Sequence, residues 1–344
     1  MIQLAIHQSE LGFHPRWASY CEQQGIPFKR VDCHASDIIE QLKDCSGLMW
    51  HHGQLTPGDL LVAEAILSAL EHTGFKVFPD WRTAWHFDDK VAQKYLLEAI
   101  GAPLVQSWVF LDRDSALQWV NTTTFPKVFK LRGGAGSANV RLVSGRKEAR
   151  KLVRLAFGAG FSNYEPWASL QERWRKYRLA KVSLLEVLKG VARIFRPPPF
   201  ARILGRESGY VYFQEFMPEN DSDTRIVVID SKAFALKRFV RDNDFRASGS
   251  GNFAYAREEF DERCVEIAFQ VTEQIGAQCA AYDFIFDANN QPKLIEVSYG
   301  FVKEVYDPCS GYWDRSMRWH EGPFNPQGWM VDVVVKAIQR DEHE

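Results

Sequence analysis

In the first third of the chain, short apolar runs alternate with stretches in which apolar residues recur at helical spacing. Short apolar runs predict buried strands at residues 2–7, 27–33, 48–52 and 75–78. Amphipathic stretches with helical spacing separate them, at residues 17–24, 38–43 and 59–72. Strands that alternate with helices predict a parallel, doubly wound sheet. Ligands bind beyond the carboxyl ends of such strands, so loops 9–15 and 51–57 are candidate binding loops.

The remaining two thirds combine a central helical region with strands joined by short turns. A helix is expected to begin with Asp88 as its N-cap and to end at Gly101 and Pro103. Further helices are expected at residues 114–120, through much of 144–206, and at 258–275. Strands are expected at residues 104–110, 210–216, 224–229, 233–240, 281–286 and 293–297, with a further pair around a glycine-rich turn at 126–143.

Composition narrows the class of protein. The 344 residues are 46% hydrophobic and 25% charged, as in soluble globular proteins. The net charge of −2 argues against a nucleic-acid binder, and no apolar run approaches the length of a membrane span. The N-terminal segment lacks the pattern of a signal peptide. The six cysteines are scattered without zinc or disulfide spacing, so we expect reduced thiols in a cytoplasmic protein.

The small net charge conceals a basic block. Residues 144–208 carry 15 Lys and Arg against 5 Asp and Glu, so the rest of the chain is correspondingly acidic. One interpretation is a solvated helical hairpin. The other is a surface that meets an anionic partner: a phosphorylated or lipid-linked substrate, or a membrane face.

Two segments carry candidate nucleotide chemistry. Lys130 ends a strand before a loop with three glycines, where backbone N–H groups and a lysine could hold phosphate oxygens, although a tight turn also explains the loop. Asp283 and Glu296 lie on adjacent strands within apolar runs. Two carboxylates there suit binding of Mg²⁺. The alternative is an exposed hairpin with solvated charges, and the apolar runs disfavour it because an unpaired buried carboxylate is costly. Arginines between these segments could stabilise a phosphoryl group, or form surface ion pairs.

In order and spacing, these motifs over roughly residues 88–301 resemble the ATP-grasp superfamily, and within it the carboxylate–amine ligases similar to glutathione synthetases and ribosomal-protein glutamate ligases. The resemblance implies an α/β (α+β) fold with an N-terminal doubly wound (pre-ATP-grasp) domain and a basic helical insertion in a lid subdomain. It implies ATP-binding roles for Lys90, Lys130, Gly133, Gly134, Gly136, Ser137, Gln214, Glu215, Phe216, Met217 and Asp223. It implies catalytic roles for Arg225, Arg238 and Arg246, and metal binding by Asp283, Glu296 and Ser298.

The expected domains follow the same resemblance. They are residues 1–87 and 88–344, with a lid subdomain at about 121–209, a helical insertion at about 160–208 and an aromatic C-terminal extension at about 302–344. Aromatic side chains in that extension either pack onto the sheet or form an acceptor pocket suited to a sugar or a flat ring.

The sequence departs from the family pattern at three places. Ser298 replaces the metal-site Asn, residues 299–301 are Tyr-Gly-Phe instead of Ser-Pro-Gly, and residues 249–252 are Gly-Ser-Gly-Asn instead of Gly-Gly. A protein that binds ATP without turnover is therefore an alternative to an active enzyme.

The implied reaction is ligation. ATP, with Mg²⁺ or Mn²⁺, would activate a carboxylate as an acylphosphate, and an amine would displace phosphate to form an amide. The expected partners are small-molecule carboxylates and amines, with a carbohydrate or lipid-linked anionic acceptor, peripheral membrane contact and a homodimer among the hypotheses. A kinase of a small-molecule hydroxyl is the second alternative.

Overall fold

The computed structural model describes residues 2–134, 139–164, 166–178, 182–196, 198–241 and 244–341. The chain divides into two compact units. Unit 1 comprises residues 1–53, 61–106 and 217–344, and unit 2 comprises residues 54–60 and 107–216. Each unit is considered by itself.

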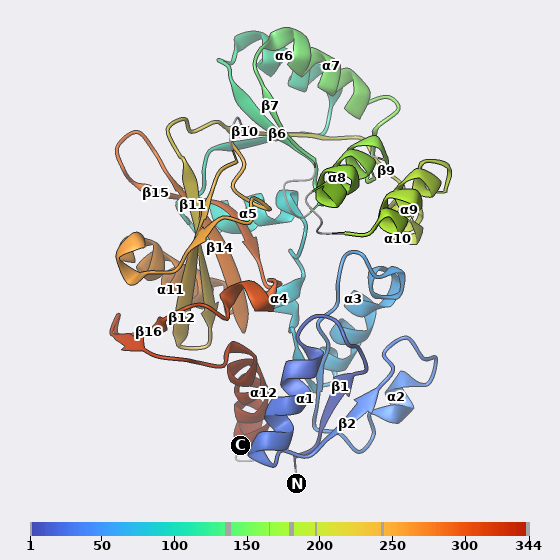
Figure 1. The fold of residues 1–344 in the computed structure, drawn as a ribbon, viewed down its shortest axis with the longest axis vertical. Helices are drawn as coiled ribbons and strands as arrows, with labels where there is room; N and C mark the ends of the chain where they lie inside the picture. The colour runs from blue at the N-terminus through green and yellow to red at the C-terminus, as the bar shows by residue number, and fades with distance from the viewer. Residues whose placement is uncertain are drawn as a thin grey trace. The chain divides into compact units, whose positions relative to one another are not determined.

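Unit 1 contains the expected parallel sheet, in the order β2–β1–β3–β4. Figure 1 labels two of these strands, β1 and β2. The strands are β1 (Leu4–His7), β2 (Phe28–Val31), β3 (Gly47–Met49) and β4 (Lys76–Phe78). The connecting helices are α1 (His14–Gln24), α2 (Ile38–Gln41) and α3 (Pro57–His72), followed by α4 (Trp81–Ala84). The prediction of a parallel sheet from alternating strands and helices is therefore confirmed.

A larger antiparallel sheet forms the rest of unit 1, in the order β15–β14–β11–β12–β16–β17, with β13 beside β12. Its strands are β11 (Ser222–Ile229), β12 (Lys232–Phe239), β13 (Phe253–Ala254), β14 (Cys279–Phe286), β15 (Pro292–Ser298), β16 (Gly311–Asp314) and β17 (Trp319–Glu321). The helical elements are α5 (Lys90–Ala99), η1 (Arg257–Glu259), α11 (Glu262–Ile275), η2 (Lys303–Tyr306) and α12 (Pro326–Asp341).

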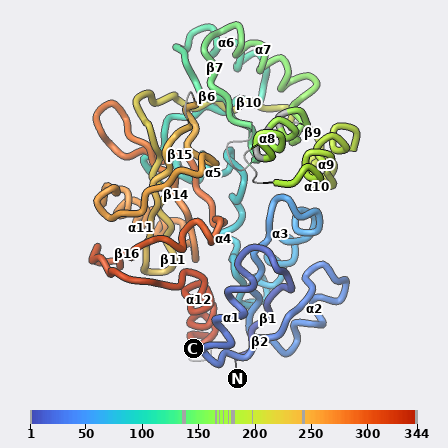
Figure 2. The backbone as a smooth tube through the Cα atoms, in the orientation of Figure 1, coloured from blue at the N-terminus to red at the C-terminus, as the bar shows by residue number. Residues whose placement is uncertain are grey.

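Apolar side chains cover both faces of this larger sheet. On β11, Ile226 and Val228 pack with α11, whereas Val227 and Ile229 share a core with β1, α1 and α12. The two sets alternate because successive strand residues point to opposite faces. Figure 2 shows α12 beside α1, where the Tyr20 hydroxyl donates to Asp332 at 2.9 Å.

Unit 2 is a four-stranded antiparallel sheet with helices on one face. Its strand order is β5–β10–β6–β7, for β5 (Ser107–Phe110), β10 (Val211–Glu215), β6 (Lys127–Lys130) and β7 (Val140–Val143). The helices α6 (Arg113–Thr122) and α7 (Arg146–Ala156) bury their apolar residues against Phe129 and Phe213. The basic region continues through β8 (Phe161–Ser162), α8 (Pro166–Arg178), α9 (Leu184–Phe195), α10 (Pro199–Leu204) and β9 (Arg206–Glu207).

Two expected boundaries are corrected. The N-cap of α5 is Asp89 instead of Asp88, because the Asp89 carboxylate accepts hydrogen bonds from the N–H groups of Val91 and Ala92 at 3.0 and 2.9 Å. The helix expected from residue 258 begins at Glu262, because Asp261 caps it by accepting from the N–H of Arg263.

The aromatic C-terminal region packs into the core of unit 1. Trp313 is fully buried between β12 and α11, and the rings of Phe324 and Trp329 stack at 5.2 Å beside Phe234. Of the two interpretations offered for this region, the structure supports packing onto the sheet for these three side chains.

All six cysteines are free, and five of them are buried. Within the described ranges, the helices all lack the combination of length and apolar character that crossing a bilayer requires.

Gly12 lies against the partly buried side chain of His51, and its replacement tests that contact. Its φ is +64°, and a Cβ would lie 2.3 Å from Nδ1 of His51, the atom that accepts a hydrogen bond from the Phe13 N–H at 3.0 Å. We expect Gly12→Ala to lower the free energy of unfolding by about 1–2 kcal/mol for left-handed backbone, with about 1–3 kcal/mol more for the overlap.

Gly25→Ala is the matched control, because Gly25 has a φ of +65° and open space around its Cβ position. Urea unfolding should show a smaller loss for Gly25→Ala than for Gly12→Ala. Equal losses in the two variants would mean that the His51 contact does not constrain residue 12.

Candidate functional site

Four charged residues expected from the sequence lie on one face of the larger sheet. Asp223 pairs with Arg238 between β11 and β12, and Arg225 pairs with Asp283 between β11 and β14. Residues directly opposite one another on antiparallel strands share a face. The same face carries Val227, so these charges continue the surface that is apolar further along the strands.

The four side chains form a continuous ionic network. Arg238 donates from Nε and Nη2 to the Asp223 carboxylate at 2.5 and 2.8 Å, and its Nη2 lies 2.6 Å from Oδ2 of Asp283. Arg225 also contacts Asp283 through two nitrogens, with Nη2 at 2.7 Å from Oδ2. The Asp223, Asp283 and Arg238 side chains are each no more than 7% exposed. The two positive and two negative charges therefore balance within a buried cluster.

Burial and pairing act in opposite directions on the two carboxyl groups. Burial alone would raise the pKa of Asp283, but the guanidinium groups of Arg225 and Arg238 hold it well below its usual range. Burial raises the pKa of Asp223 to about 6 against the attraction of Arg238, and the neighbouring Asp283 charge adds to the rise. Asp283 is thus the firmly ionised carboxylate of the pair.

Glu296 lies next to this network on β15. It pairs directly with Asp283, and the register of the two strands shifts immediately beyond that pair, with Phe284 opposite Leu294. Lys90 at the start of α5 places Nζ 3.6 Å from Oε1 of Glu296 and 4.0 Å from Oδ1 of Asp88. The Lys90 side chain is only 4% exposed, whereas that of Glu296 is 27% exposed. The expected adjacency of Asp283 and Glu296 is thus present in the strand register.

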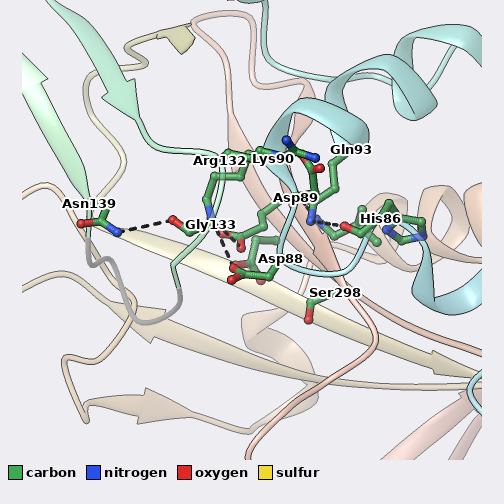
Figure 3. Close-up of polar contacts among 12 residues, drawn as sticks. His86, Asp88, Asp89, Lys90, Gln93, Arg132, Gly133, Asn139 and Ser298 are labelled. Carbon is green, nitrogen blue, oxygen red and sulfur yellow. Dashed lines mark hydrogen bonds and ion pairs between the residues drawn. The ribbon is translucent and has the colours of Figure 1, made fainter. Parts of the chain in front are cut away.

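The start of α5 is held in place around Lys90 (Figure 3). Asp89 caps the helix, and Gln93 one turn later donates from Nε2 to the backbone oxygen of His86 at 3.0 Å. Asp88 has a positive φ of +54°. Sequence reasoning gave Asp88 only a capping role and overlooked it as an acidic neighbour of Lys90, although the Asp-Asp-Lys run was visible.

Ser298 is the last residue of β15, and its side chain takes part in a local turn. Its Oγ lies 3.1 Å from the carbonyl oxygen of Gly300 and accepts from the Gly300 N–H at 3.2 Å. Next to it, Tyr299 is fully buried and donates its hydroxyl to the backbone oxygen of His52 at 2.7 Å. The Tyr-Gly-Phe departure from the family pattern is therefore part of the packed interior of unit 1.

The donor set on β14 and β15 fits Mg²⁺ that arrives with a nucleotide. Hard carboxylate oxygens are its preferred protein ligands, and it commonly keeps water and phosphate oxygens as the others. Over the ranges that the structure describes, no three His, Cys, Asp or Glu side chains gather closely enough to hold a metal ion. A metal here would need ligands beyond Asp283 and Glu296, and it would compete with the two arginines for Asp283.

In unit 2, Lys130 lies on the sheet face opposite α6 and α7. It pairs with Tyr212 across β6 and β10, and it alternates with Phe129, which faces the helices. On the Lys130 face, Gln214 and Tyr212 donate to the Ser107 Oγ at 3.0 and 2.9 Å. Lys130 and Gln214 are both buried. Two of the residues expected to bind ATP thus share one polar strip of this sheet.

Glu215 has a side-chain role that the sequence did not suggest. Both of its carboxylate oxygens accept from Lys127 Nζ at 2.8 Å, and that ammonium also lies 5.5 Å from the centre of the Trp108 ring. Glu215 was expected from the resemblance to bind ATP, and this ion pair engages only its side chain. Phe216 and Met217 follow directly after β10.

A carboxylate of unit 2 accepts hydrogen bonds from the first backbone N–H groups of the glycine-rich loop. Glu207 accepts from the N–H of Arg132 at 3.0 Å and from that of Gly133 at 3.4 Å, and it also accepts from the Tyr210 hydroxyl. Asn139 donates to the Gly133 oxygen at 3.5 Å. Glu207 is 74 residues from Gly133, so no local motif indicated it. These amides therefore bind a carboxylate, as a phosphate-binding loop would bind an anion.

Of the remaining expected residues, the structure describes Arg246 and Gly134 but not Gly136 and Ser137. Arg246 forms an ion pair with Asp244 at 2.7 Å in the loop after β12, and Gly134 follows Gly133 with a φ of +118°. Gly136 and Ser137 lie outside the described residues.

Tyr306 is a buried neighbour of the ionic network that sequence reasoning missed, and burial raises the pKa of its hydroxyl.

Comparison with known proteins identifies the fold. Residues 202–304 match the family model described as a RimK-like ATP-grasp domain. A search of curated proteins found no match. A RimK domain ATP-grasp protein from Sphaerobacter thermophilus is 15% identical, with a TM-score of 0.56 over 97% of this chain and 99% of that one.

Two further solved structures are similar over nearly their whole length. D-cycloserine synthetase DcsG is 14% identical, with a TM-score of 0.59 over 98% of this chain and 99% of that one. D-alanine–D-alanine ligase from Bacillus anthracis is 12% identical, with a TM-score of 0.54 over the full length of both chains. At these identities the likeness shows the fold, and the expected α/β ATP-grasp fold is confirmed.

Proposed function

We propose that this chain, which has an ATP-grasp fold with a RimK-like segment at residues 202–304, is an ATP- and Mg²⁺-dependent carboxylate–amine ligase. The observation that carries the proposal is the charged face of the larger sheet, where Asp283 and Glu296 adjoin the buried Arg238, the partly buried Arg225 and Lys90. Such an array suits phosphoryl transfer, in which catalysis is largely positioning and electrostatic stabilisation.

The residues of unit 1 would act on the phosphates and the activated carboxylate. Asp283 and Glu296 would hold Mg²⁺, which neutralises phosphate charge when bound. Arg225 and Arg238 would release part of their hold on Asp283 and stabilise the transferred phosphoryl group. Lys90 would exchange its long contact with Glu296 for a nucleotide phosphate. Arg246 would contribute a further positive charge.

The residues of unit 2 would bind the rest of the nucleotide. Lys130 would contact phosphates from its buried position on β6. The segment Gln214–Met217 would hold adenine, with main-chain contacts from Glu215 to Met217. The amides of Gly133 and Gly134 are proposed as phosphate donors, in which case the nucleotide competes with Glu207 for the Gly133 N–H. Asp223, expected from the resemblance to bind ATP, would first have to leave Arg238.

In the proposed reaction, a substrate carboxylate oxygen attacks the γ-phosphorus and ADP leaves. The amine nitrogen of a second substrate then attacks the acyl carbon of the acylphosphate. Inorganic phosphate leaves and the amine loses a proton, so an amide forms. No protein nucleophile is needed.

The test is product analysis with purified protein, MgATP and a library of acids paired with amines. We expect inorganic phosphate release that depends on both an acid and an amine, with the amide detected by mass spectrometry. Formation of ADP and a phosphoester without free phosphate would instead identify a kinase. Thermal stabilisation by ATP without turnover would identify a binding module, which the engaged Ser298 and Asp283 side chains favour as the second candidate.

The same library of acids and amines tests which class of amine accepts the acyl group. We propose a carbohydrate-bearing or lipid-linked anionic amine, because the partly exposed Trp319 and His320 on β17 set aromatic faces beside polar groups. Stimulation by amino sugars supports this acceptor class, whereas selective stimulation by unmodified amino acids contradicts it. The homodimer expected from the sequence stays a prediction.

A further inference from the structure

Helix α9 in unit 2 presents an uncovered apolar face. Leu184, Leu188, Val191 and Phe195 recur at the three- and four-residue spacing of one helix face. Their exposed fractions are 50%, 57%, 42% and 82%, and Leu185 beside them is 60% exposed. Soluble monomers rarely leave a contiguous row of large apolar side chains in water.

The orientation of α9 is set by its packing on α8. Val187 and Gly190 are buried on the flank of α9 next to the row, and a Cβ at residue 190 would lie 2.9 Å from Cδ of Arg173. Arg173 also donates from Nη1 to the Glu186 carboxylate at 2.5 Å and to its carbonyl oxygen at 3.1 Å. The two helices lie side by side in Figures 1 and 2. The apolar row is therefore left exposed, because α9 packs on α8 through the flank that holds Val187 and Gly190.

Cations border the apolar row. Lys189, Arg193 and Arg196 lie on or directly after α9, and the whole segment 144–208 has a large positive excess. A second copy of this chain seated on the row would bring the same cations against their own kind. An anionic lipid surface satisfies both features at once, since it takes apolar side chains into its interface and attracts the basic border.

We propose that α9 docks this protein on anionic membrane surfaces, with the helix lying in the plane of the interface and its apolar row among the acyl chains. Exposed Trp167 and Trp174 on the neighbouring α8 are residue types that favour the same interface. The proposal is independent of the ligase proposal, because it concerns where the protein resides and uses none of the residues assigned to nucleotide.

Vesicle co-sedimentation of the full chain tests the proposal. We expect retention on vesicles of phosphatidylcholine mixed with phosphatidylglycerol at low salt, and much weaker retention on phosphatidylcholine alone or at high salt. Leu188→Glu and Phe195→Glu should each reduce retention about tenfold or more, because a carboxylate would replace an inserted apolar group. Arg193→Gln should weaken retention and reduce its dependence on salt.

Leu111→Glu is the matched control, since Leu111 is 73% exposed in unit 2 but lies outside α9. Retention of this variant like that of wild type supports docking by α9. Failure of wild type to bind anionic vesicles at low salt would overturn the proposal, as would full retention of both α9 variants. A lipid-free dimer that Leu188→Glu converts to monomer would instead assign the row to a second copy.

Discussion

Replacement of Glu296 by alanine is expected to abolish ATP turnover while the protein remains folded. The variant removes one of the two carboxylates proposed to hold Mg²⁺ and the partner of Lys90. Loss of one such electrostatic group typically costs about 10²–10³ in rate, and loss of a metal ligand costs more. The side chain is 27% exposed and its ion pair is long, at 3.6 Å, so we expect little change in thermal stability. Phosphate release and thermal unfolding would be measured on the same preparation.

Glu266→Ala provides the control, because Glu266 is an exposed glutamate on α11, on the other side of the sheet. It should keep wild-type turnover. Lys130→Ala in unit 2 should lose turnover as Glu296→Ala does. Wild-type turnover by Glu296→Ala would exclude Glu296 as a metal ligand.

Replacement of Arg238 by alanine is expected to give the largest loss of stability. It leaves Asp223 buried without the guanidinium that donates two hydrogen bonds to it, whereas Asp283 keeps Arg225. Breaking a buried pair from one side typically costs about 3–5 kcal/mol, because a buried charge loses its compensation. Urea unfolding followed by tryptophan fluorescence would measure the free energy of unfolding.

The loss in Arg238→Ala should depend on pH. Burial already raises the pKa of Asp223 to about 6 beside Arg238, and removal of Arg238 should raise it further. A carboxyl group whose folded pKa is raised favours the folded state at pH values below its unfolded pKa, and this contribution is lost as pH rises through the folded pKa. The difference between wild type and variant should therefore be larger at pH 8 than at pH 5.

A double variant separates charge from packing. Arg238→Met with Asp223→Leu removes both charges and keeps the Arg225–Asp283 pair, and replacement of a buried pair by apolar groups is often near neutral in stability. We expect the double variant to recover most of the loss and to lose its pH dependence. A double variant as unstable as Arg238→Ala would show that the side-chain packing of residue 238, and not the unpaired carboxylate, carries the effect.

The sequence determined the features that depend on local order. Apolar runs that alternate with helically spaced apolar residues predicted the parallel sheet of β1–β4, since both patterns depend only on residues close together in the sequence. The apolar runs around Asp283 and Glu296 predicted two paired strands, and the register places these two residues directly opposite each other. The resemblance of its lysine, glycine, arginine and acidic motifs to those of the ATP-grasp superfamily implied the fold.

Only the tertiary structure decided which groups meet. Arg225 and Asp283 are 58 residues apart, and Glu207 reaches the amide of Gly133 across 74 residues. Such partners depend on strand register and on which face each residue takes, and a one-residue shift would reverse the face. The choice between Asp88 and Asp89 as N-cap likewise depended on carboxylate geometry. The exposure of the apolar row of α9 became visible only once α8 was seen to pack against the neighbouring flank, because burial is a property of packing and not of local order.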